Sequence, residues 1–383
     1  MAPLVRGHDA YTAVEFAENA AGDTWGAAPS GTTPYHYKRI PIISETMTLN
    51  REFYPKTNEY GESGAVPYMD QGRAFVSGSI TFAPRYNQEW FWALMGQFFW
   101  DEVINTPNLD YTGAALTGAN QHAFSFASTV PKGFALKIWK GGASAAGYIQ
   151  TFLGCMITRM VWEQPEDDVP RITLDILGKS TSLSSLSGTP SDVGELNDGA
   201  VTTPQYVKPR DLSNSVGTWS KFQTGATLTQ LNIRGFTLTV DRHIEFETAF
   251  ATAPDTPEQP GVTETRDITM EIRSLLEQDF GGTNKPYKEF VDRTTSKCRV
   301  QYASPNAMTG SARYVIMLDF PAVVWEEARA SVSEPGAPPT NFKWRAISGT
   351  FATPATPPAA ASDMRILTHV LSAEDADDEF SVL

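Results

Sequence analysis

Residues 133–163 read GFALKIWKGGASAAGYIQTFLGCMITRMVWE, and residues 296–326 read SKCRVQYASPNAMTGSARYVIMLDFPAVVWE. Aligned without a gap, both stretches end on the same tripeptide, Val161-Trp162-Glu163 in the first and Val324-Trp325-Glu326 in the second. Both are rich in β-branched and aromatic residues, which favour strands. The pattern indicates two copies of one strand-rich unit within a single chain.

Shorter matches extend the two copies, and they occur in the same order in each. Four matches in one order are harder to attribute to chance than any one of them. The further pairs are Thr48-Leu49 with Thr237-Leu238, Ile80-Thr81 with Ile268-Thr269, and a strand ending at Gly178 with one ending at Gly349. A repeat of this length has the size of a domain.

We therefore predict a mainly β chain of two tandem domains, each resembling a β-sandwich or barrel with a flanking α-helix. The arm and linker around them are rich in Ala, Gly, Ser, Thr and Pro, which is typical of extended segments. The acidic end, 373–383, is either a docking tail or disordered. The predicted segments are an N-terminal arm (1–37), a first domain (38–180), a linker (181–224), a second domain (225–352) and a C-terminal tail (353–383).

One segment departs from the β pattern. Trp90, Leu94 and Phe98 lie four residues apart, and a parallel row runs from Phe91 to Phe99. This apolar stripe predicts an α-helix over residues 87–100 that lies across a sheet or in a subunit contact. Residues 101–126 have no counterpart in the second copy, so we expect a long excursion there.

Composition narrows the class of protein. The chain of 383 residues is 41% hydrophobic and 19% charged, as in a soluble globular protein of two or three domains. Its formal charge of −14 disfavours gripping a polyanion such as DNA. Cys155 and Cys298 lie in apolar runs, which favours buried free thiols over a disulfide or a zinc site.

The chain shows neither a signal peptide nor a membrane-spanning segment. Its first residues lack the basic and apolar regions of a signal peptide, and the most apolar stretch, Trp90 to Trp100, is about half the length that spans a bilayer. We therefore expect no membrane insertion, and a protein that is made in the cytoplasm.

No catalytic motif is present. The chain lacks Gly-x-Ser-x-Gly, a complete phosphate-binding loop and His-Glu-x-x-His, so we predict no catalytic, cofactor or metal site and no enzyme activity. Two acidic groups could imitate such sites, and we interpret both as solvated surface. They are Asp241, His243, Glu245 and Glu247, which strand spacing would put on one face, and Glu163, Glu166, Asp167 and Asp168, at a turn.

The repeated tryptophans have a structural interpretation. Trp162 and Trp325 end corresponding strands, and a large aromatic side chain at such a position is most simply a core anchor. We predict that the two side chains are paired core anchors of equivalent strands.

Several segments together resemble a known family. They are Ile40–Thr46, Gly78–Trp100, Phe152–Ile157 with the strand ending at Leu177-Gly178, Asn232–Val240 and Ile316–Trp325. In their order the chain is similar to the tail tube (major tail) proteins of long-tailed bacteriophages, of the larger kind with two tandem tube domains. The resemblance covers residues 38–180 and 225–352, and it depends on strand order.

The resemblance implies a structural virion protein of the phage tail, assembled in the host cytoplasm. Tube domains form rings by pairing their sheets edge to edge, and single-domain members form hexamers. A two-domain chain would form a trimeric ring with pseudo-sixfold symmetry. Such rings stack into a tube through which double-stranded DNA passes into the host. The implied partners are further copies, the tape measure protein and tail terminator or baseplate proteins.

Two Pro-rich loops follow equivalent strands of the copies, so we expect them on the same side of a ring. We predict that they bridge successive rings. The residues assigned to this contact are Pro55, Asn58, Tyr60, Pro67 and Met69 in the first copy and Pro254, Pro257 and Pro260 in the second.

Other functions remain open at this point. A baseplate hub, tail-tip ring or head–tail adaptor would use the same kind of sandwich, and copy number in the particle separates these from a tube. A β-sandwich binding module or an enzyme is the third class. Duplicated halves suit a ring and have no evident use around a single binding site.

Overall fold

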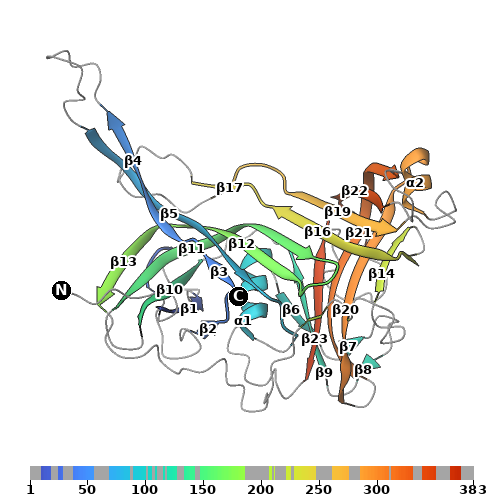
Figure 1. Cartoon of the computed structure of the whole chain (residues 1–383), viewed down its shortest axis with the longest axis horizontal. Coiled ribbons are helices and arrows are strands. Elements are labelled where there is room, and N and C mark those ends of the chain that lie inside the picture. The colour runs from blue at the N-terminus through green and yellow to red at the C-terminus, as the bar shows by residue number, and fades with distance from the viewer. Residues whose placement is uncertain are drawn as a thin grey trace.

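The computed structural model is mainly β, and Figure 1 shows its strands together with helices α1 and α2. Short turns and excursions connect long antiparallel strands, as expected from the β-branched and aromatic composition. The structure describes residues 10–18, 25–28, 38–55, 69–86, 89–100, 102–105, 108–109, 115–116, 119–126, 133–142, 147–185, 207–208, 211, 221–225, 228–246, 261–275, 285–309, 312–330, 339–350 and 363–371.

One antiparallel sheet runs through the whole molecule, and we call it the long sheet. At one edge β3 (Ser44–Glu45) and β4 (Thr48–Pro55) both pair with β5. From there each strand pairs with the next, in the order β5 (Met69–Phe82), β12 (Arg171–Gly178), β11 (Gly147–Gln164), β16 (Ile233–Asp241), β19 (Asp267–Leu275), β22 (Pro339–Ile347) and β21 (Ala312–Ala330).

The two longest strands, β11 and β21, each continue into a second sheet. The first half of β11 lies between β10 (Phe134–Gly142) and β13 (Ser180–Ser185), and the first half of β21 lies between β20 (Ser296–Thr309) and β23 (Arg365–Leu371). Outer strands extend these sheets: β1 (Ala10–Glu18) and β2 (Lys38–Ile40) beyond β10, and β14 (Lys221–Gly225) with β15 (Thr229–Gln230) beyond β20.

The strands of the long sheet form two strand sets. The first set, from the first copy, is β3, β4, β5, β12 and β11, and the second set, from the second copy, is β16, β19, β22 and β21. The register of pairing relates the two sets to each other. Trp162 pairs with Ile172, and Trp325 pairs with Trp344. Thr239 pairs with Thr269, and the residue opposite the matching Thr81 is Ser44. The sequence match of Thr48-Leu49 with Thr237-Leu238 is therefore out of register with the strands. The pairing matches Thr239 with Ser44, because a dipeptide match carries less information than a ladder of pairs.

A buried row of side chains crosses the long sheet. Each member is directly opposite the next, and none is more than 5% exposed. Alternate side chains of a strand point to opposite faces, so this row defines the core face of the sheet. The row is Phe82, Ile172, Trp162, Leu238, Met270, Trp344 and Trp325.

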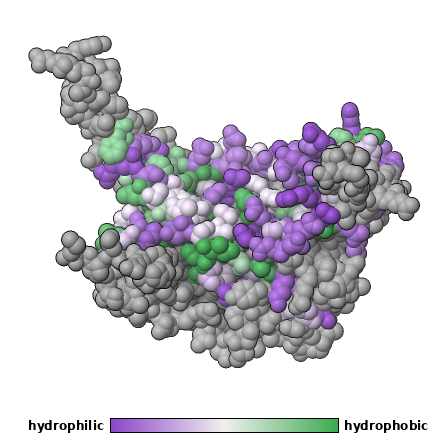
Figure 2. Space-filling view, viewed as in Figure 1, coloured by the Kyte–Doolittle hydropathy of each residue, from purple (hydrophilic) through white to green (hydrophobic). Residues whose placement is uncertain are grey.

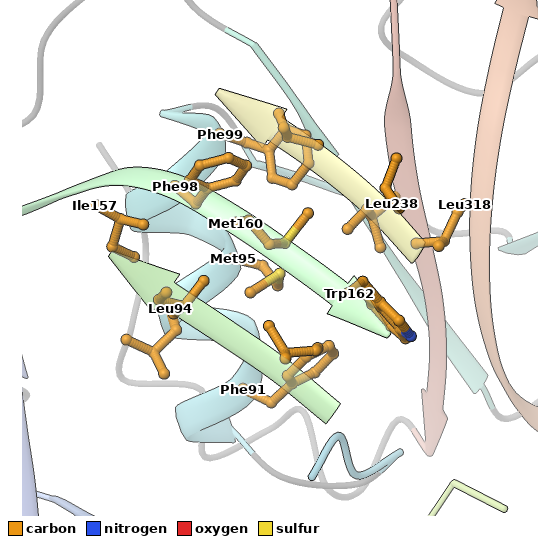
Figure 3. Packing of buried hydrophobic residues seen from close by; sticks show 14 of the residues in the cluster. Phe91, Leu94, Met95, Phe98, Phe99, Ile157, Met160, Trp162, Leu238 and Leu318 are labelled. Carbon is orange, nitrogen blue, oxygen red and sulfur yellow. The ribbon is translucent and has the colours of Figure 1, made fainter. Parts of the chain in front are cut away.

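The predicted helix is confirmed as α1 (Glu89–Phe99) and packs against this core face. Figure 3 shows Phe91, Leu94, Met95, Phe98 and Phe99 directed at the side chains of β11 and β16. The rings of Phe91 and Trp162 meet edge to face with centroids 6.4 Å apart. All described side chains of α1 except Gln97 are buried hydrophobics or glycine, which explains why its apolar surface extends beyond a single stripe.

The excursion, the predicted C-terminal tail and the predicted arm each contribute strands that the sequence pattern did not assign. The excursion forms β6 (Glu102–Asn105), β7 (Asn108–Leu109), β8 (Ala115–Leu116) and β9 (Ala119–Ser125), and β9 pairs with β23. The predicted C-terminal tail contains β23, which lies between β21 and β9. The predicted arm contains β1. These strands lacked a repeat counterpart or periodic signal, so the sequence pattern did not assign them; the acidic end, 373–383, lies outside the described residues.

The remaining elements are small. Helix α2 (Pro286–Asp292) packs on β21 and β14, and a hairpin of β17 (Ile244–Glu245) and β18 (Gly261–Val262) follows β16. Cys155 and Cys298 are free and buried, as predicted, and burial raises the pKa of both thiols. No helix in the described part of the chain is long and apolar enough to cross a membrane.

Leu238 tests the contact between β16 and β11. Its side chain is fully buried opposite Trp162, so Leu238→Ala should lower the free energy of unfolding by about 2–5 kcal/mol, measured by urea denaturation. The matched control is Leu183→Ala, because Leu183 is 68% exposed on β13 and should change stability by less than about 0.5 kcal/mol. Equal losses would contradict the assigned burial.

Candidate functional site

The face of the long sheet opposite α1 is mostly polar, with Val161 and Val324 as apolar members of its central row. Because neighbours in register share a face, the pairing identifies its residues row by row. Within the central row the hydroxyls of Thr81 and Thr173 lie 3.0 Å apart. That row is Ser44, Thr81, Thr173, Val161, Thr239, Thr269, Arg345 and Val324.

The rows on either side of it carry most of the charge. We call these three rows together the polar band. One flanking row is Ser79, Asp175, Arg159, Asp241 and Asp267. The other is Arg171, Glu163, Thr237, Glu271, Lys343 and Glu327.

Each cation of the polar band lies next to a carboxylate. Arg345 donates to Glu326 Oε1 from Nε at 2.6 Å and also pairs with Asp267, and the bond to Glu326 is the main cause of its raised pKa. Lys343 Nζ lies 3.8 Å from Glu326 Oε2. The other two pairs are Arg159 with Asp175, at 3.8 Å, and Arg171 with Asp168.

At each edge of the long sheet, the outermost strand pairs with a described strand on one side only. Beyond Val323, the described strands pair with β21 on its β22 side alone, because β20 begins at Ser296, opposite Val323. At the other edge, β3 and β4 pair among the described strands with β5 alone. Unpaired strand edges are templates for pairing with another chain.

Exposed apolar side chains gather at both edges. Ile43 is 55% exposed, although its counterpart in register, Leu238, is fully buried. Leu49 and Phe53 follow on β4, and Val324 lies on the opposite edge. Helix α2, next to β21, exposes Tyr287, Phe290 and Val291.

Trp325 lies beneath α2 and binds this helix to β21. Trp325 Nε1 donates to Glu289 Oε2 at 3.0 Å and lies 3.1 Å from Ser296 Oγ, and all three side chains are buried. The indole therefore ties α2 and the start of β20 to β21. The side chain of Trp162 is instead stacked on Tyr302 of β20, with centroids 5.9 Å apart.

Buried arginines hold the C-terminal strand β23, and the sequence pattern did not identify them. Asp319 accepts hydrogen bonds from Arg299 at 3.1 Å and from Arg365 at 2.8 Å, and all three are nearly inaccessible. They join β20, β21 and β23. The available signal was a single acidic residue, Asp319, in the apolar run Val315–Phe320, because a buried carboxylate requires cationic partners.

Arg242 is a second buried cation. Its guanidinium carbon lies 3.4 Å from the ring centre of Trp100 and 5.2 Å from that of Phe126, and Nη1 donates to the carbonyl of Phe98. Burial, the largest cause, and the nearby charge of Arg266 lower the pKa of Arg242 to about 9. This side chain anchors the end of β16 to the end of α1 through cation–π contacts.

The structure breaks the strand spacing that would put Asp241, His243 and Glu245 on one face, although His243 Nδ1 lies 3.7 Å from Asp241 Oδ1. Strand β16 ends at Asp241, and His243 has φ 48°, so the chain turns before β17. His243 N–H donates to Asp241 Oδ1 at 2.9 Å, and Glu247 lies outside the described residues. Among the residues that the structure describes, no group of three His, Cys, Asp or Glu side chains could hold a metal ion.

The acidic turn is solvated, as the sequence suggested. Glu163 is exposed near the end of β11, and Glu166, Asp167 and Asp168 are exposed in the turn between β11 and β12. The inter-ring assignments fall almost entirely outside the described residues. Pro55 ends β4 and Met69 begins β5. Asn58, Tyr60, Pro67, Pro254, Pro257 and Pro260 are not among the described residues.

The polar band predicts opposite pH effects at two carboxylates. Burial raises the pKa of Asp175, Arg159 lowers it in part, and Asp241 raises it further. A raised folded-state pKa favours the protonated form, so this carboxyl contributes stability in acid that is lost as the pH rises through the folded pKa. Asp175→Asn should therefore raise the melting temperature near neutral pH, with no advantage in acid.

The control is Asp168→Asn, measured by thermal unfolding over the same pH series. The backbone N–H of Val169, first, and Arg171 lower the pKa of Asp168, so its ionised form stabilises the fold above the unfolded pKa and this contribution is lost in acid. We expect the melting temperature of this variant to fall near neutral pH. Effects of the same sign for both variants would contradict the assigned environments.

Comparison with known proteins supplies the family. The family model described as phage tail tube protein matches residues 23–346, which is most of the chain. None of the curated proteins matches the chain. The matched segment contains helices α1 and α2 and all of the long sheet except Ile347, the last residue of β22. The chain belongs to the phage tail tube protein family.

Proposed function

We propose that three copies of this chain close into a ring with pseudo-sixfold symmetry, and that stacked rings form the tube through which double-stranded DNA enters the host. Family membership supports the structural role in the tail. The proposal includes the tandem organisation of the chain, its assembly in the host cytoplasm, and contacts with the tape measure protein and with tail terminator or baseplate proteins.

The observation that most directly supports ring formation is the pairing of β11 with β16. These strands belong to different strand sets, and six consecutive pairs, from Arg159–Asp241 to Gln164–Phe236, join them edge to edge. The junction supports the proposal that one set can pair with the edge of another. A head-to-tail contact of this kind closes into a ring when its rotation divides the circle.

The open edges fit the same junction between chains. Val161 pairs with Thr239 inside the chain, and the matching residues are Val324 on β21 and Ser44 on β3. Both are at open edges. Pairing β21 of one copy with the β3–β4 edge of the next would continue the long sheet from chain to chain and leave no edge unpaired once the ring closes.

Burial of apolar side chains supplies a driving force for this contact. Leu238 is fully buried at the internal junction, whereas Ile43 is exposed. Covering one such side chain contributes about 1.5–3 kcal/mol. The exposed side chains of α2 lie on the helix that packs on β21, and Ile43 of a neighbouring copy would approach this side of the sheet.

Negative-stain electron microscopy of the purified protein over a concentration series tests the function. We expect hollow tubes, or rings of three subunits that show six similar lobes in axial averages. Rings that never stack would favour a single-ring component such as a hub or adaptor. Monomers at every concentration would contradict self-assembly of the chain.

Cysteine pairs test which edges meet. Val324→Cys combined with Ser44→Cys, Thr46→Cys or Thr48→Cys places thiols on one face at steps of about 7 Å, and a disulfide needs Cβ atoms about 3.5–4.5 Å apart. We expect the strongest disulfide between chains for Ser44→Cys, seen as covalent multimers on non-reducing gels. Rings without a disulfide at any of the three positions would reject this edge.

A matched variant controls for collision between exposed thiols. Val324→Cys with Asp167→Cys places the second thiol on the solvated β11–β12 turn, away from both edges, and should give only monomers. The native thiols Cys155 and Cys298 are fully buried and can remain.

Stacking of rings forms a separate part of the proposal. Figure 1 shows β4 and β5 extending together away from the body of the molecule. The first-copy residues assigned to inter-ring contact lie at the ends of these strands, as Pro55 and Met69 do, or in the sequence between them. Deleting residues 56–66 should preserve rings or smaller soluble species and abolish tubes, as seen by electron microscopy. Normal tubes from this variant would rule out the loop as the bridge.

A further inference from the structure

We propose that Arg242 is a latch on the internal junction: once β16 has paired with β11, its guanidinium closes the base of the excursion and holds the excursion against α1. The base consists of Trp100, which directly precedes the excursion, and Phe126, which ends it. The latch acts within a single chain, and it goes beyond the proposed function because it does not depend on rings or tubes.

The internal junction sets the position of Arg242. The residue directly follows β16, and its backbone N–H donates to the carbonyl of Thr158 on β11 at 3.0 Å. Figure 2 shows hydrophilic residues along the side of the molecule that β16, β19 and β22 occupy in Figure 1, and the side chain of Arg159 on β11 is 45% exposed. Arg242 is instead 1% exposed, and a buried cation is retained only with good partners.

The side chain of Arg242 reaches both ends of the excursion. Its Nη1 donates to the carbonyl of Phe98 in the last turn of α1, which contains no basic residue of its own. A cation at this position satisfies a carbonyl of the helix end and opposes the negative end of the helix dipole. The guanidinium carbon lies 3.4 Å from the ring centre of Trp100 and 5.2 Å from that of Phe126.

Trp100 depends on such a contact because its backbone is strained. Its φ is 68°, in the left-handed region that bulky residues rarely adopt. Its N–H donates to the carbonyl of Gly96 at 2.7 Å, so this residue ends the helix before the chain enters β6. Without the guanidinium on its ring, Trp100 would lose the cation–π contact that offsets this conformation.

Phe126 also contacts a second arginine. The guanidinium carbon of Arg266 lies 4.3 Å from the ring centre of Phe126, and its nitrogens donate to both carboxylate oxygens of Asp363 at 3.2 and 3.3 Å. The last pair of the β16–β19 ladder directly precedes Arg242 and directly follows Arg266. Two cations at one end of a ladder repel each other, and the aromatic ring and Asp363 offset that repulsion.

The matching positions at the open edge of the long sheet carry no charge. In the register of the two strand sets, Arg242 matches Met47 and Arg266 matches Gly78. A Cβ at Gly78 would meet the backbone of Met47 at 2.6 Å, so this edge has no room for a second arginine. The edge left for a neighbouring copy therefore lacks these two cations, and the latch belongs to the junction inside the chain.

Hydrogen exchange of the full-length chain, followed by mass spectrometry, tests the latch. Arg242→Met keeps the length of the side chain, removes its charge and copies the residue at the matching position. We expect amide exchange in β6 and β9 to become at least about tenfold faster, because a buried cation–π contact and the charge at the helix end are lost together. Exchange in β22 should change by less than about twofold, since only the excursion is released. Unchanged exchange in β9 would overturn the proposal.

Two further variants separate the latch from a general loss of stability or of charge. Arg159→Met removes an exposed arginine of the same junction and should leave exchange in β9 unchanged. Phe126→Leu keeps an apolar side chain but removes the ring that both guanidinium groups contact, so it should also speed exchange in β9. This variant serves if Arg242→Met does not fold. Equal effects of Arg242→Met and Arg159→Met on β9 would contradict the latch.

Chemical rescue identifies the group that acts. In Arg242→Ala, added ethylguanidinium can occupy the space of the missing side chain, and it should return exchange in β9 towards the wild-type rate. Ethylurea has a similar shape without the charge and should give no protection. Protection by both compounds would show that filling the space is sufficient, and protection by neither would show that the guanidinium does not hold the excursion. Either result overturns the latch.

Discussion

The antiparallel pairing of β11 with β16 is the contact on which the architecture depends. It converts two strand sets into one continuous sheet, with Trp162 and Leu238 opposite each other in the core. Without it, each set would expose a long edge and an apolar row. The same contact also defines what the ends of the sheet lack, because the residues that match its two sides, Val324 and Ser44, lie on open edges.

Alternation along these strands, interrupted by β-bulges after Ile157 and after Trp325, separates the two faces of the sheet. Residues that pair across it form either a row of buried aromatic and aliphatic side chains or a row of hydroxyls and ion pairs. A slip of one residue at any strand would exchange the faces, placing Arg345 or Asp175 against α1. Core packing and the chemistry of the polar band are therefore fixed by one register, and neither can change without the other.

Buried charged side chains stabilise segments that have no counterpart in the other copy. Asp319 joins Arg299 and Arg365 where β23 and the excursion extend the second sheet, and Arg242 ties β16 to the end of α1. Such groups are costly to bury and are retained only with good partners. Their partners come from segments far apart in the chain, so these contacts favour one arrangement of the excursion and the C-terminal strand over others.

The sequence by itself determined the mainly β class, the helix from Glu89 to Phe99, the buried thiols and the absence of a catalytic motif, because these follow from local periodicity and residue type. Only the tertiary structure decided that β9 pairs with β23, that Ser44 matches Thr239, and that Arg345 meets both Asp267 and Glu326. Strand partners and register depend on pairing between distant segments, and a one-dimensional pattern gives the faces of a strand without giving its neighbours.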